Sequence, residues 1–157
     1  RDVMLDVPVF WIADTDYLYT TLVAAFIPIL WLRISPRFPF HYLLIADAFG
    51  LALFNVVGIE KALANDTGIA VAVAMGTITG VFGGLLRDVI CREVPLVLNG
   101  ELYAMTCIAG GFAYGAGLYF DLATQWCGIA ALITTVLLRL GSLRWHWQLP
   151  VFYSEQS

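Results

Sequence analysis

The sequence predicts an all-α integral membrane protein with an inverted repeat, and three observations support this fold class. Hydrophobic residues make up 61% of the 157 positions and charged residues only 13%, which a soluble domain of this size would not tolerate. The apolar stretches are long enough to cross a bilayer as helices, and they lack the two-residue alternation of transmembrane strands. A short charged signature also occurs twice along the chain.

Five apolar stretches are expected to form membrane helices, because each approaches the roughly 20 residues that span a bilayer. These stretches are 17–32, 42–64, 67–86, 102–120 and 122–138. The first is uncharged and precedes a proline-rich turn, whereas the second is interrupted by Asp47 and closes at Lys61. The third holds the densest glycine usage in the chain, and the fourth contains a GxxxG pair, which is typical of helix association. The fifth ends in a tail rich in arginine and tryptophan that starts at Arg139.

The repeated signature predicts the topology. Arg1-Asp2, followed by Pro8, recurs as Arg87-Asp88, followed by Pro95. Three expected spans separate the two copies, so the copies should face opposite sides of the bilayer. Inverted repeats of this kind are typical of proteins that move solutes across membranes.

Basic residues predict the orientation of the chain. Six arginines fall on one side of the expected spans, and two basic residues fall on the other. The six are Arg33, Arg37, Arg87, Arg92, Arg139 and Arg144, and the two are Arg1 and Lys61. The positive-inside rule then makes the C-terminus cytoplasmic.

Three segments follow from this topology. Residues 1–40 are expected to end the first repeat, 41–120 to form the second, and 121–157 to form a final helix with a cytoplasmic tail. Because a glycine-rich helix precedes Arg87, an equivalent helix is expected before Arg1. The natural protein is therefore expected to continue upstream by about two helices, at about 20 residues per span.

The glycine-rich stretch presents an almost bare face. Gly76, Gly80, Gly83 and Arg87 fall within about 60° of one another on a helical wheel, and Gly84 lies beside them. Such a face allows close helix packing, but glycine pairs also permit kinks that leave backbone carbonyls free to line a polar path. We favour a bent helix beside a narrow aqueous path, with close packing alone as the other explanation.

The charged residues within or beside the spans are candidates for pore-mouth or gating groups. These candidates are Arg1, Asp2, Asp47, Lys61, Arg87, Asp88, Arg92 and Glu93. An intramembrane carboxylate such as Asp47 is a functional candidate by default, although it could instead be a structural cap. Arg87 and Asp88 could likewise be an interfacial anchor or a local ion pair. The weaker candidates are individually better explained by interfacial solvation or hydrogen bonds between helices; they are Asn55, Glu60, Glu93, Tyr103 and Thr106.

Several function classes find no support in the sequence. No Ser/His/Asp set, metal-ligand cluster or phosphate loop occurs, so neither an enzyme nor a bound metal or cofactor is expected. No basic run suggests nucleic acid. The expected partners are membrane lipid, transported monovalent cations and other copies of the chain.

The motifs resemble a known family. Gly83-Gly84 with Arg87-Asp88, followed by Glu93-Val94-Pro95, is similar to the second repeat of the bacterial relatives of TRIC, the trimeric intracellular cation channels. Residues 47–50 and 58–61 resemble the helix that opens that repeat, and residues 8–12 resemble the end of the first repeat. Bacterial members of this group have also been labelled glycine transporters.

The resemblance implies a seven-helix subunit with two inverted three-helix repeats and a final helix, assembled as a homotrimer with one ion path per subunit. About five of those helices lie in this chain. The family's glycine-bearing helices bend at the pore, which would assign Gly80, Gly83 and Gly84 here. Arg92-Glu93-Val94 is similar to a Lys-Glu-Val tripeptide linked to phosphoinositide binding in eukaryotic members, although arginine replaces lysine here.

The expected function is a passive channel for monovalent cations, with potassium preferred, in a bacterial inner membrane. Glycine carbonyls with the hydroxyls of Thr77 and Thr79 would replace part of the ion's hydration shell. Asp47 and Asp88 would favour cations. A secondary transporter for glycine or another small amino acid is the alternative, and a purely structural membrane oligomer is a third hypothesis.

Overall fold

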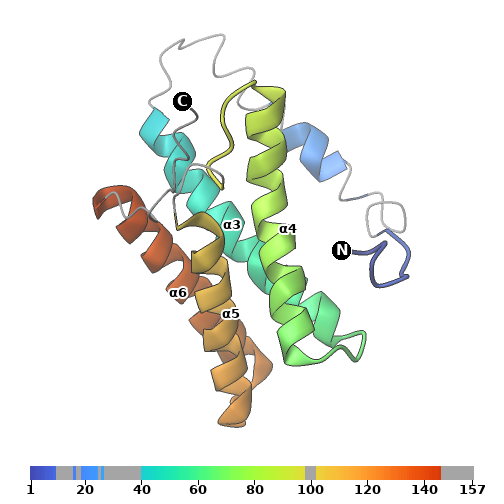
Figure 1. Cartoon of the computed structure of the whole chain (residues 1–157). Coiled ribbons are helices and arrows are strands. Elements are labelled where there is room, and N and C mark those ends of the chain that lie inside the picture. Colours follow the sequence, from blue (N-terminus) through green and yellow to red (C-terminus); the bar gives the residue numbers. More distant parts are fainter. Residues whose placement is uncertain (10–15, 17–18, 25, 27–39, 98–101, 146–157) are drawn as a thin grey trace, which may run out of the picture. The chain divides into compact units, whose positions relative to one another are not determined.

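The computed structural model describes residues 1–9, 16, 19–24, 26, 40–97 and 102–145, and its regular structure within these ranges is entirely helical (Figure 1). The all-α prediction is therefore confirmed. The chain divides into two units, 1–44 and 45–157. The three predicted segments, with boundaries at 40/41 and 120/121, stay predictions.

Four helices have defined bounds. They are α3 (Phe40–Leu63), α4 (Ile69–Ile90), α5 (Tyr103–Tyr119) and α6 (Thr124–Trp145). Within the described part, the helical segments Tyr42–Leu63, Ile69–Ile90 and Thr124–Trp145 are long and apolar enough to cross a membrane. With 17 residues, α5 is at the lower limit of spanning length. The first predicted span, 17–32, lies mostly outside the described residues. Residues 19–24 within this span are described, and they are helical.

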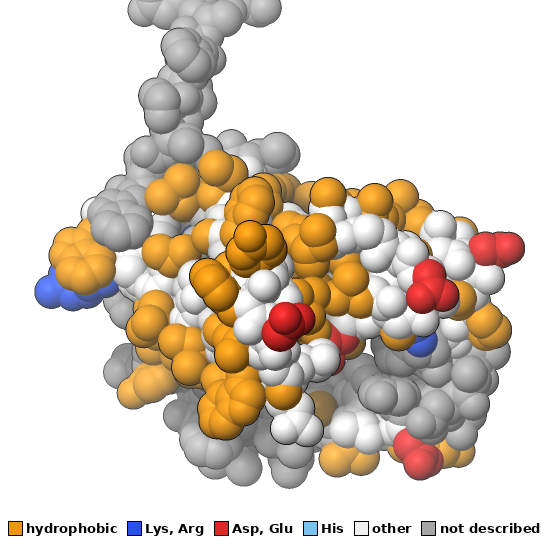
Figure 2. Space-filling view, turned by 90° about the horizontal axis from the view of Figure 1, so that it is seen from below, with side chains coloured by type: hydrophobic (Ala, Val, Ile, Leu, Met, Phe, Trp, Pro, Cys, Tyr) orange, Lys and Arg blue, Asp and Glu red, His pale blue; other side chains and the backbone are white. Residues whose placement is uncertain are grey.

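Many large hydrophobic side chains on these helices point outward. Phe112 on α5 is 71% exposed and Leu137 on α6 is 64% exposed. Figure 2, which views the helices from the end with the α3–α4 and α5–α6 turns, shows hydrophobic side chains together with a few separate acidic ones. Exposed apolar side chains in this number suit a surface that faces lipid.

Helices α3, α4 and α5 end in the same way. A residue with positive φ follows each helix, Asp66 at 57°, Arg92 at 58° and Asp121 at 52°. The next backbone N–H then bonds back five residues, as from Glu93 to the carbonyl of Asp88 at 2.9 Å. This backbone bond gives a partner to a carbonyl that would otherwise have none at the helix C-terminus. Figure 1 shows the α3–α4 and α5–α6 turns at the same end of the helices.

Glycines bring α3 and α4 into close contact. A Cβ at Gly76 would lie 2.6 Å from the backbone oxygen of Asn55, and one at Gly80 would lie 2.8 Å from the backbone oxygen of Leu51. A Cβ at Gly58 on α3 would lie 2.7 Å from the Cα of Gly76. Gly76 and Gly80 thus serve close packing, which was one of the two explanations for the glycine pattern, whereas Gly83 on the same face is exposed. A bend beside a polar path stays a prediction.

Asn55 links three helices at the centre of this packing. Its side chain is fully buried, and its Nδ2 donates to the backbone oxygen of Cys107 on α5 at 2.9 Å and to Oγ1 of Thr135 on α6 at 3.5 Å. Gly110 lies against the Thr135 hydroxyl and Gly117 against Cys127, so α5 and α6 also approach closely through small residues. Polar side chains that bond across helices hold such bundles together in lipid.

The glycine contacts predict a difference between two neighbouring substitutions on α4. Gly76→Ala places a methyl group into the backbone of α3 and should cost about 1–3 kcal/mol of stability, as overpacking does. Gly83→Ala enters open space, with nothing within 4 Å of the new atom, and should leave stability equal or raise it by up to about 1 kcal/mol through helix propensity. Thermal unfolding of both variants in detergent measures the difference. Equal loss of stability in the two variants would contradict the packing assigned to Gly76.

Candidate functional site

An ionic network lies where α3 and α4 meet. Arg87, in the last turn of α4, places Nη1 2.8 Å from Oδ1 of Asp47 on α3. Its Nη2 and Nε lie 2.8 and 2.9 Å from Oδ1 of Asp88. The two carboxylate side chains are only 9% and 5% exposed, whereas Arg87 is 28% exposed. One guanidinium therefore pairs with two nearly buried carboxylates and also forms the more accessible side of the network.

The charge of Asp88 needs a cationic partner because Asp88 lies near the C-terminus of α4. A carboxylate at a helix C-terminus is disfavoured by the helix dipole, by about 0.3–1 kcal/mol. The guanidinium of Arg87 offsets this cost, and the backbone N–H of Leu96 donates to the second oxygen, Oδ2, at 3.0 Å. Charge-assisted bonds of this kind are worth about 1.5–3 kcal/mol each. The loop after α4 is thereby tied to the ionic network.

Tyr103 closes the network on the side of α5. Its hydroxyl donates to Oδ2 of Asp47 at 3.1 Å. The same hydroxyl fills the space over Gly84, where a Cβ would overlap it, and Oδ1 of Asp47 lies 3.5 Å from that Cβ position. The side chain of Tyr103 is 2% exposed and packs with Leu51 and Cys107. The absence of a side chain at Gly84 is what lets α5 reach the carboxylate on α3.

The structure places Arg139 differently from the prediction made from the sequence. The fifth span was expected to end at Leu138, with Arg139 in a cytoplasmic tail. Instead, α6 continues to Trp145, and the Arg139 side chain is fully buried, with its guanidinium carbon 4.5 Å from the centre of the Tyr103 ring. The charge was read as the end of the span, although Leu138, Leu140 and Leu143 continue the apolar pattern. That continuing pattern is the signal that could have identified Arg139.

The two copies of the Arg-Asp signature have the same local structure. Nε of Arg1 donates to Oδ1 of Asp2 at 2.7 Å, as Arg87 does to Asp88 at 2.9 Å. Asp6 has a φ of 51° and Arg92 a φ of 58°, at the same distance from each signature. The backbone bonds match as well, with Val7 donating to Asp2 and Glu93 to Asp88. The repeat inferred from a few residues therefore extends to the local backbone conformation after each copy.

The other predicted site residues lie apart from this network. Thr77 and Thr79 donate their hydroxyls to the α4 carbonyls of Val73 and Met75, at 2.9 and 2.6 Å. Gly83 is exposed, Lys61 lies in the last turn of α3, and Arg92 and Glu93 are exposed after α4. Their roles in an ion path stay predictions. Within the ranges that the structure describes, no group of three or more His, Cys, Asp or Glu residues could hold a metal ion.

Comparison with known proteins gives consistent relationships. A family model described as "Glycine transporter" matches residues 44–118. The UPF0126 membrane protein of Vibrio cholerae is 40% identical over 97% of this chain and 64% of its own length. The UPF0126 inner membrane protein YadS of Escherichia coli is 39% identical over 100% of this chain and 77% of its own. The chain thus spans about two thirds to three quarters of these relatives.

Solved structures of TRIC proteins share the fold. The trimeric intracellular cation channel orthologue from Rhodobacter sphaeroides is 34% identical, with a TM-score of 0.86 over 94% of this chain and 76% of that one. A structure concerned with conductance through TRIC cation channels is 29% identical, with a TM-score of 0.86 over 99% of this chain and 77% of that one. These families are described by transport and conduction and not by catalysis. The chain belongs to the UPF0126 family of membrane proteins and has the fold of the prokaryotic TRIC channels.

Proposed function

We propose that the chain forms the greater part of a homotrimeric channel for monovalent cations, chiefly potassium, with one path in each subunit of a bacterial inner membrane. The single observation that carries the proposal is the network of Asp47, Arg87 and Asp88 between α3 and α4. Charged groups within membrane helices are costly, and they are by default candidates for an ion pathway. The similarity to conducting TRIC structures supports the same function.

The network would act on cations through its balance of charge. Asp47 and Asp88 attract cations, but the positive charge of Arg87 offsets one of their two negative charges as long as it bridges both carboxylates. The exposed side of Arg87 lets water and ions reach the bridge. Cation occupancy of the path would therefore depend on how often Arg87 leaves the carboxylates. Arg92 and Glu93, which are exposed after α4, would set the potential at the same mouth, and Lys61 would do so at the other end of α3.

Topology and assembly are part of the proposal. The matched local structures of the two Arg-Asp copies support a repeat, and the distribution of basic residues supports its inversion, with Arg1 facing outward, Arg87 inward and a cytoplasmic C-terminus. The exposed apolar surface of the helices gives a second copy of the chain, or lipid, a large area to cover. The description of the Rhodobacter orthologue as trimeric supports three copies.

A carrier for glycine or another small amino acid is the second candidate. The family model described as a glycine transporter supports it, and inverted repeats suit carriers as well as channels. The substrate would then occupy the space beside the exposed Gly83.

Removal of the bridging cation is expected to increase cation conduction. Arg87→Ala leaves the carboxylates of Asp47 and Asp88 without their cationic partner, so the local cation concentration should rise. Single-channel conductance or open probability in planar bilayers should rise several-fold, and more so at low ionic strength, because salt screens exposed charges beyond a Debye length of about 10 Å at 0.1 M. Arg144→Ala, at the exposed end of α6, is the matched control. Currents unaltered in Arg87→Ala would remove Arg87 from the ion path.

The two candidate functions predict different transport by the purified full-length protein in liposomes. A channel gives ohmic potassium current with unitary steps, because ions pass without a conformational cycle for each ion. A carrier gives glycine uptake that saturates and is competed by unlabelled glycine. Measurement of both in the same preparation decides between them. Saturable glycine uptake without cation current would overturn the channel proposal.

A further inference from the structure

An apolar groove lies between α4 and α5, at the end of the helices that carries the α3–α4 and α5–α6 turns. Its volume is about 570 Å³, and it is lined by Ile69, Ala70 and Val73 of α4 and by the face of α5 that extends from Gly111 to Tyr119. No charged side chain lines it. Because Ile69 begins α4 and Arg87 lies in its last turn, the groove and the ionic network lie at opposite ends of that helix.

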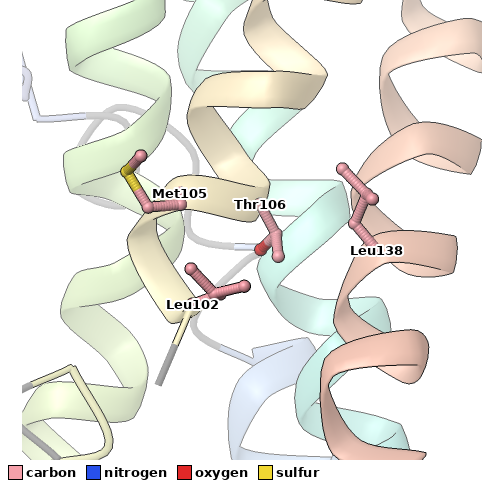
Figure 3. A pocket seen from close by; sticks show the side chains of 4 residues that line it. All are labelled: Leu102, Met105, Thr106 and Leu138. Carbon is pink, nitrogen blue, oxygen red and sulfur yellow. The ribbon is translucent and has the colours of Figure 1, made fainter. Parts of the chain in front are cut away.

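The size of the groove suits a long hydrocarbon chain. An apolar cavity of about 150 Å³ holds one benzene ring, so the groove, at about 570 Å³, has room for a much longer chain. A second cavity, between the start of α5 and α6, has a volume of only about 80 Å³ and is lined by Leu102, Met105, Thr106 and Leu138 (Figure 3). That cavity is too small even for a benzene ring, so of the two the groove is the candidate for a ligand.

The length of the groove matches one leaflet of a bilayer. Gly111 is the middle residue of the 17 in α5, and the lining of α5 extends from there to the end of the helix. At 1.5 Å per residue this is about 12 Å, compared with about 15 Å for half of a hydrocarbon core of about 30 Å. At the inner end, Val73 lies directly against Gly111 and leaves no space for a Cβ. A neighbouring membrane helix would span the whole core, whereas an acyl chain ends near the midplane, as the groove does.

The charges beside the mouth of the groove suit an ammonium group. Asp66 lies in the turn before α4 and Asp121 in the turn after α5, and both are exposed. Residues 64–73 and 111–126, which contain the lining and both turns, include no Lys or Arg. The nearest basic residue along the chain is Lys61, in the last turn of α3. A cationic headgroup is therefore favoured at this end over a purely anionic one.

The start of α4 adds a partner for a phosphate. The N-cap residue is Gly68, and within the described part of the chain no side chain caps the helix there. The first backbone N–H groups and the positive end of the helix dipole are thus available to an anionic group. A headgroup with both a phosphate and an ammonium finds complementary charge at the same mouth.

We propose that the groove between α4 and α5 binds an acyl chain of phosphatidylethanolamine, from the leaflet that contains the α3–α4 and α5–α6 turns. The ammonium group lies near Asp66 and Asp121, and the chain extends along α5 as far as Gly111. Tyr119 and Phe112, which line the groove and are 84% and 71% exposed, flank the chain, and an exposed tyrosine at a helix end suits the headgroup level. Phosphatidylglycerol lacks the ammonium group, so the same aspartates disfavour it.

Photocrosslinking of the full-length protein identifies what occupies the groove. The photoreactive residue p-benzoyl-L-phenylalanine replaces Phe112, and the protein is irradiated in liposomes that contain equal amounts of phosphatidylethanolamine and phosphatidylglycerol. The mass of the adduct shows which lipid lay beside this position. Phosphatidylethanolamine adducts should exceed phosphatidylglycerol adducts about threefold to fivefold, which corresponds to one exposed ion pair of roughly 0.7–1 kcal/mol.

A matched control position separates a site from ordinary contact with lipid. Leu137 on α6 is 64% exposed and does not line the groove. The same photoreactive residue in place of Leu137 should give the two lipid adducts in equal amounts, because it reports the bulk composition of the membrane.

Further substitutions test the headgroup contact and the groove separately. Asp66→Asn combined with Asp121→Asn removes both charges, and asparagine tolerates the positive φ of these positions. The enrichment should then fall to the level of the control position. Ala116→Phe fills the groove from an exposed position of its lining and should abolish the enrichment too. Ala74→Phe, at an exposed alanine of α4 outside the lining, should leave it unchanged.

Three outcomes would overturn the lipid site. A crosslink to a second copy, seen as a dimer after denaturation, would show that a subunit interface covers the groove. A crosslink within one chain would show that another segment of the same protein covers it. Equal amounts of the two lipid adducts at position 112 would show contact with bulk lipid and no site. Because adduct mass is the readout, the result is independent of whether the protein conducts cations or carries glycine.

Discussion

One guanidinium held between two nearly buried carboxylates is the interaction on which the rest of the structure depends. In an apolar bundle, the charges of Asp47 and Asp88 can be kept only if a cation and hydrogen-bond donors lie within reach, since an unpaired buried charge costs several kcal/mol. Arg87 supplies the cation, and Tyr103 and the backbone of Leu96 supply further donors. Helices α3, α4 and α5 and the loop after α4 must therefore be positioned so that these groups reach one another.

Close packing of the helices makes this positioning possible. Asp47 on α3 meets Arg87 on α4 because the two helices touch through Gly76 and Gly80, with no side chains to hold them apart. Asn55 then fixes α5 and α6 to the same point on α3 through Cys107 and Thr135. The glycines of α4 thus have two roles along one face. Gly76 and Gly80 set the distance between α3 and α4, and Gly84 leaves the space that the Tyr103 hydroxyl occupies.

The sequence predicted the helical architecture well, because long apolar stretches and their charged ends are strong local signals. The expected second and third spans lie within a few residues of α3 and α4. It also identified Asp47 and the Arg87-Asp88 pair as candidates. It did not show that Asp47 meets Arg87, because contact between residues 40 positions apart depends on packing between helices. Tyr103 was undervalued for the same reason, since a tyrosine near a span end is ordinarily an interfacial residue.

Arg139 shows where a local rule misleads. A charge after an apolar run usually marks the membrane boundary, but here it lies inside the helix, where an aromatic ring from a neighbouring helix receives it. The most direct measurement of the central claim is a double-mutant cycle between Asp47→Asn and Arg87→Gln, read by unfolding of the full-length protein in detergent. The account predicts a coupling energy of about 1–3 kcal/mol between the two positions, because each charge is costly without the other. Strictly additive effects would contradict it.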